Sequence, residues 1–134
     1  MLPVDDTDIR LFLHVLAATI WVGGQLTLAG LVPVMRRLGP DATRQLARQY
    51  DRIAWPAFAL AVVTGVWNLF EVNLGARSTE YQVTLMVKLL LVAVTGIGAA
   101  VHRATSSRTL LVVGGAAAAV GALGALFLGV QLHG

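Results

Sequence analysis

The sequence predicts an all-α integral membrane protein, an antiparallel bundle of four membrane-spanning helices. Its 134 residues are 57% hydrophobic and only 13% charged. Four apolar runs reach the length of about 20 residues that a helix needs to cross a hydrocarbon core roughly 30 Å thick. No polar stretch is long enough for a separate soluble domain, so we expect one four-span domain over residues 1–134.

The expected spans lie at about residues 9–34, 53–74, 82–101 and 109–131. Basic residues gather in the connections after spans one and three, and few lie on the opposite side. The positive-inside rule therefore places these two connections in the cytoplasm and both termini on the non-cytoplasmic side of a multi-pass protein of the cytoplasmic membrane. The basic residues of the two connections are Arg36, Arg37, Arg44, Arg48, Arg52, Arg103 and Arg108.

The composition also excludes some classes of function. The net charge is +3, but the basic residues flank the spans and form no patch interleaved with aromatic residues, so nucleic acid is not an expected partner. The chain contains no cysteine, which excludes disulfides, thiolate metal ligands and iron–sulfur clusters.

Span one carries polar and aromatic residues on one helical stripe. His14, Trp21 and Gln25 are separated by steps of seven and four, so their side chains project from the same face. An ionisable group within hydrocarbon is costly unless it meets a partner, so we expect this stripe to face protein or a ligand.

The first connection begins with a break at Gly39 and Pro40, after which Asp41 can cap a short amphipathic helix at the membrane interface. Its arginines are interpreted as topology determinants that contact lipid headgroups. Span two is expected to begin near Trp55, with Pro56 in its first turn, where a missing N–H does no harm. Its outer half carries a second polar stripe, which consists of Thr64, Trp67, Asn68 and Glu71.

Spans three and four differ in character. In span three Thr84, Lys88, Thr95 and His102 share one face. Span four has no ionisable group before His133, and its small residues form two rows suited to close helix packing. The neighbour of these rows can be another span, a second copy in a homodimer or another subunit of a membrane complex, and the remaining apolar surface faces the bilayer. The two rows are Gly114, Ala118 and Ala122, and Gly121, Ala125 and Gly129.

Depth in the membrane suggests which polar residues can meet. At about 1.5 Å per residue, His14 and Lys88 both lie roughly 8 to 9 Å below the outer boundary, whereas His102 emerges on the inner side. Trp67 and Asn68 reach the same outer third. Each residue also has a purely structural interpretation: His14 as an interhelical hydrogen-bond partner, the tryptophans as packing residues, and Lys88 as a snorkelling side chain paired with Glu71.

Two motifs carry a resemblance to known families. Span one reads L-H14-x6-W21-x-G23-G24, and span three reads T-x3-K88-L-x12-H102-R103. The chain resembles the CopD (copper resistance D) membrane domain and, more remotely, the HemJ-type four-span haem proteins. The HemJ resemblance implies a b-type haem held by His14 and Lys88, and the CopD resemblance implies copper passage across the membrane.

Three functions therefore stand as hypotheses. In the leading one, haem b lies between spans one and three on His14 and Lys88, beside Trp21, Gly24, Trp67 and Asn68, and serves electron transfer or the oxidation of a substrate by a membrane oxidoreductase. In the second, copper enters at His14 and His133. In the third, the chain is a cofactor-free subunit of a larger membrane complex.

Overall fold

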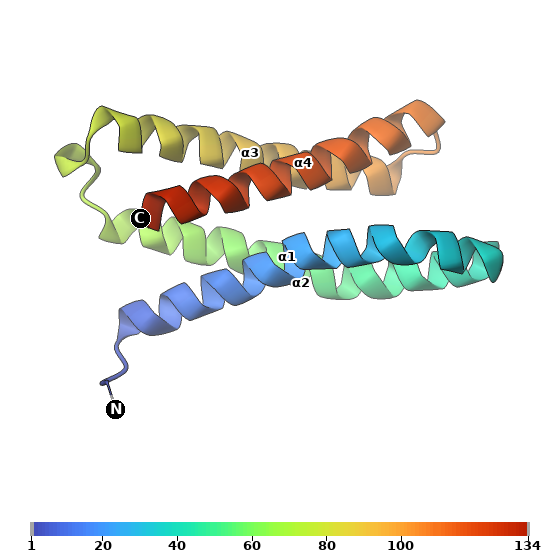
Figure 1. The fold of residues 1–134 in the computed structure, drawn as a ribbon, viewed down its shortest axis with the longest axis horizontal. Coiled ribbons are helices and arrows are strands. Elements are labelled where there is room, and N and C mark those ends of the chain that lie inside the picture. The colour runs from blue at the N-terminus through green and yellow to red at the C-terminus, as the bar shows by residue number, and fades with distance from the viewer. Residues whose placement is uncertain (1, 134) are drawn as a thin grey trace. The chain divides into compact units, whose positions relative to one another are not determined.

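A computed structural model describes residues 2–133, which form four long α-helices and one short 3₁₀ helix (Figure 1). The elements are α1 (Asp6–Arg37), α2 (Pro40–Glu71), η1 (Leu74–Ala76), α3 (Thr79–Ala104) and α4 (Arg108–His133). All four α-helices are long and apolar enough to cross a membrane. The predicted all-α fold with four spans is confirmed at this level.

The chain divides into two compact units, Met1–Val72 and Asn73–Gly134. Each unit is a hairpin of two long helices, α1 with α2 and α3 with α4 (Figure 1). The membrane orientation of the termini and the organisation of the chain as a single domain stay predictions.

The link between α1 and α2 is only two residues long. The N–H groups of Leu38 and Gly39 donate to carbonyls in the last turn of α1, and Gly39 has a φ of +110°. A side chain at that φ is strained, so glycine suits the reversal. Pro40 then occupies the first turn of α2, where its missing N–H costs nothing.

Residues 40–52 are the first turns of α2, and the described residues contain no separate interfacial helix in this connection. The expected position of Pro56 in a first turn is therefore wrong, because Pro56 lies inside α2. A helix can pass through a proline at the loss of one backbone hydrogen bond and with a local bend, and such prolines are tolerated in membrane helices. The amphipathic stretch and the apolar span are joined into one helix.

Small residues bring α3 and α4 into close contact. A Cβ added to Gly98 would lie 2.8 Å from the backbone oxygen of Gly114, and one added to Gly121 would lie 2.9 Å from the backbone oxygen of Leu91. The Thr95 hydroxyl donates to the Ala118 carbonyl at 2.6 Å, between the two helices. The small-residue rows of span four thus pack against α3 of the same chain.

Candidate functional site

The clearest polar contact between α1 and α2 joins His14 to Thr64. His14 Nδ1 lies 2.9 Å from Thr64 Oγ1, and Thr64 is only 2% exposed. The Thr64 hydroxyl donates its hydrogen within its own helix, at 2.7 Å to the Leu60 carbonyl. Since a hydroxyl has one hydrogen, Thr64 can accept a hydrogen bond from an Nδ1–H group of His14 while its own hydrogen goes to the Leu60 carbonyl.

A glycine in α2 makes room for this imidazole. A Cβ added to Gly65 would lie 3.3 Å from His14 Cε1, tighter than most contacts of a real Cβ. Gly65 and Thr64 are consecutive, so one short segment of α2 provides both the space for the ring and the acceptor for its proton. The position of the ring is therefore set by α2.

Toward the N-terminal end of α1, one turn from His14, lies a charged cluster. Arg10 is 8% exposed, and its Nη1 lies 3.7 Å from Glu71 Oε1. Its guanidinium carbon also lies 5.8 Å from the centroid of the Trp67 ring. Glu71, which the sequence allowed as a partner of Lys88, thus pairs with Arg10. Asn68 lies in the same stretch of α2 and is half-buried.

The glycine and tryptophan of the first motif serve the α1–α2 contact. Trp21 is 5% exposed, and its ring centroid lies 4.5 Å from that of Phe58 and 5.5 Å from that of Trp55. A Cβ added to Gly24 would lie 2.9 Å from Cε2 of Tyr50. Two residues expected beside a porphyrin are therefore packed against side chains of α2.

Lys88 belongs to the other unit and approaches α4. Its Nζ would lie 3.1 Å from a Cβ added to Gly129. His133, one turn further along α4, donates Nδ1–H to the Gly129 carbonyl at 2.9 Å. The pairing of His14 with Lys88, and that of His14 with His133, stay predictions.

His102 has a structural contact at the opposite end of its unit. Its Nδ1 donates to the Leu111 carbonyl at 2.7 Å and so ties the end of α3 to the beginning of α4. Gly115 gives this ring its space, because a Cβ there would lie 3.0 Å from Nδ1. No group of three or more His, Cys, Asp or Glu side chains that could hold a metal ion occurs within residues 2–133.

Four apolar helices joined by short connections define a multi-pass, all-helical membrane protein. Within that class the family model of copper resistance protein D, CopD, matches residues 44–131, about two thirds of the chain. The chain belongs to the CopD family. The matched segment contains Thr64, Trp67 and Lys88, whereas His14 and the rest of α1 precede it. No curated protein and no solved structure matches the chain.

Proposed function

We propose that this CopD-family protein handles copper as cargo and that His14 provides the ligand through which the ion enters. The observation that carries the proposal is the contact of 2.9 Å between His14 Nδ1 and Thr64 Oγ1, which holds the imidazole between α1 and α2. Family membership suggests the metal, and His14 offers an imidazole within a long apolar helix.

The chemistry of the ligand suits copper. Imidazole binds copper well, and Cu²⁺ forms the strongest complexes among the divalent first-row metals. A transported ion must bind well enough to enter and weakly enough to leave, and a single imidazole offers an exchangeable position of that kind. The second ligand proposed for entry is His133, at the end of α4.

Thr64 acts as the positioning residue of this proposal. A hydrogen bond to the far nitrogen of a metal-binding histidine fixes its tautomer and orientation. Thr64 is itself held by its bond to the Leu60 carbonyl, so the acceptor does not rotate freely. We infer that α2 holds the His14 imidazole in the orientation in which it binds the metal.

The second candidate is the haem protein in which His14 and Lys88 bind iron. The same contact with Thr64 favours it, because an oriented imidazole can serve iron as it serves copper. Against it stands the packing of the α1–α2 hairpin: a macrocycle at Gly24 would have to displace Tyr50, whose Cε2 lies within 2.9 Å of a Cβ position there. Copper is therefore the better supported of the two, and electron transfer belongs to the weaker alternative.

The third candidate is a cofactor-free subunit that docks through the small residues of span four. Gly114 and Gly121 pack against backbone atoms of α3, so these rows are used within the chain. A homodimer or a membrane complex would then be formed through other surfaces of the four helices.

The test is titration of the purified protein with Cu²⁺ by isothermal calorimetry, together with an absorption spectrum after expression with ample haem. We expect histidine-dependent copper binding that His14→Ala abolishes and His133→Ala weakens. His102→Ala is the matched control. It also removes one imidazole, but from the connection between α3 and α4, where no copper ligand is proposed. Equal copper binding by wild type and His14→Ala would end the copper proposal, and a Soret band lost only in His14→Ala would establish the haem candidate.

A further inference from the structure

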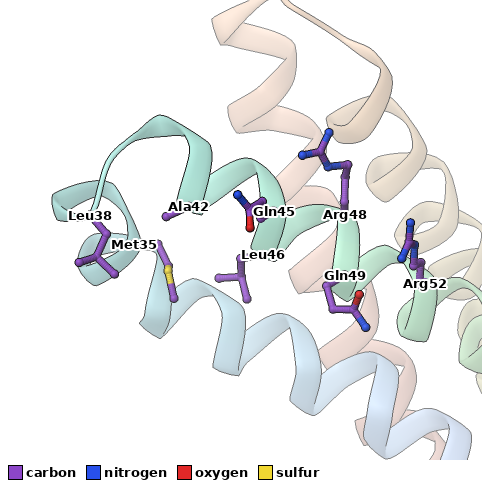
Figure 2. Close-up of a pocket in the computed structure, with 8 residues that line it drawn as sticks. All are labelled: Met35, Leu38, Ala42, Gln45, Leu46, Arg48, Gln49 and Arg52. Atoms are coloured by element: carbon purple, nitrogen blue, oxygen red, sulfur yellow. The ribbon is translucent and has the colours of Figure 1, made fainter.

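An open groove lies where the end of α1 meets the beginning of α2 (Figure 2). It encloses about 630 Å³. Met35 and Leu38 contribute from α1 and its cap, and the other lining residues come from the first turns of α2. All of these residues belong to the α1–α2 unit.

One part of the groove is basic. Arg48 and Arg52 are one helical turn apart, and Figure 2 shows both side chains extending from α2 in the same general direction, away from α1. Both are exposed, and within residues 2–133 neither forms an ion pair with a carboxylate. The nearby Arg44, in contrast, pairs with Asp41 at 3.9 Å. Two unpaired guanidinium groups at this spacing suit one phosphate.

The other part of the groove is apolar. Met35 and Leu46 are half-buried, whereas Leu38 is 69% exposed. Figure 2 shows Leu46 and Gln49 on the side of α2 that faces α1, close to the level of Met35. The groove therefore has hydrocarbon and an amide on the side of α2 that faces α1, and a pair of cations on the side turned away from α1.

We propose that this groove is a binding site for one anionic phospholipid. The phosphate lies between Arg48 and Arg52, the amide of Gln49 contacts the glycerol ester region, and an acyl chain runs over Met35, Leu38 and Leu46. Charge complementarity selects an anionic headgroup, and the apolar lining selects a lipid over a free anion. The proposal is independent of copper binding at His14.

The experiment is native mass spectrometry of the full-length protein released from micelles that contain phosphatidylglycerol or phosphatidylcholine with identical acyl chains. We expect retention of one phosphatidylglycerol molecule and little retention of phosphatidylcholine. Arg48→Gln combined with Arg52→Gln should lower the affinity for phosphatidylglycerol about thirtyfold, as expected for two basic residues at a charged lipid surface. Arg36→Gln combined with Arg37→Gln removes the same charge beside the groove and should retain the lipid.

A second variant tests the apolar part without changing the charge. Leu46→Gln should weaken phosphatidylglycerol retention, and circular dichroism of each variant checks that the helices are formed. Equal retention of the two lipids, or loss of phosphatidylglycerol in both arginine pairs alike, would overturn the site. Displacement of the lipid by millimolar inorganic phosphate would show that a free anion, rather than a lipid, is the ligand.

Discussion

His14 and Thr64 lie 50 positions apart in the sequence, and a hydrogen bond of 2.9 Å joins them across the α1–α2 hairpin. The bond fixes the imidazole of α1 against α2. It thereby connects the packing of a helical hairpin with the ligand chemistry of its only histidine.

Replacing Thr64 by valine removes the hydroxyl that contacts His14 Nδ1 while keeping the shape of the side chain. We expect Thr64→Val to lower the copper affinity about tenfold or more, as for other partners of metal-binding histidines. Calorimetric titration against wild type measures the change. Thr19→Val is the control, because the Thr19 hydroxyl donates to the Val15 carbonyl of its own helix at an exposed position. Unchanged affinity in Thr64→Val would show that the bond is only structural.

Gly24 and Tyr50 form a second testable pair. Gly24→Ala should destabilise the hairpin by about 1–3 kcal/mol, because the new methyl group would overlap the Tyr50 ring. Gly23→Ala, at the neighbouring position, has nothing within 4 Å and should be neutral or slightly stabilising. Thermal unfolding followed by circular dichroism compares the two.

A double-mutant cycle separates this overlap from a general effect of alanine. In a Tyr50→Leu background, which has a smaller side chain at that place, Gly24→Ala should cost less than in wild type. The Tyr50 hydroxyl is buried and has no hydrogen-bond partner within residues 2–133, so its removal leaves no donor or acceptor unpaired. Equal costs in the two backgrounds would argue that Tyr50 is not the cause.

The contact between α3 and α4 predicts a larger sensitivity to added volume. Gly98→Ala places a Cβ 2.8 Å from backbone atoms of Gly114 and Ala118, which cannot move aside as a side chain can. We expect the free energy of unfolding by sodium dodecyl sulfate to fall by about 3 kcal/mol or more. Gly30→Ala, on a helix surface with nothing within 4 Å, serves as the control. A variant at Gly98 as stable as the one at Gly30 would contradict the close packing.

The sequence predicted the four helices because apolar runs of this length have few alternatives in a membrane protein. The sequence did not predict that α2 begins at Pro40. Hydropathy distinguishes the amphipathic residues 40–52 from the apolar span that follows, although one continuous helix contains both. Pro56 supported the wrong start for the second span, because proline is common in the first turn of a helix. Proline is also tolerated inside membrane helices, and this is its position in α2.

The polar stripes were also visible in the sequence, but their partners were not. The expected depth in the membrane shows which residues lie at the same level, but it does not show which helices are neighbours. Thr64, which the structure places against His14, was on the predicted stripe of span two without an assigned partner. Glu71 was assigned to Lys88 as one alternative, whereas Arg10, on the adjacent helix of the hairpin, contacts it. Both pairs, His14 with Thr64 and Arg10 with Glu71, join the consecutive helices α1 and α2.

The two-residue link at Leu38 and Gly39 allows the contacts between α1 and α2 to form early during synthesis of the chain. A nascent chain that has emerged as far as Glu71 already contains both members of every pair between α1 and α2, and so short a hinge keeps their search brief. The contact between His14 and Thr64 can therefore form while the ribosome is still adding the second half of the protein.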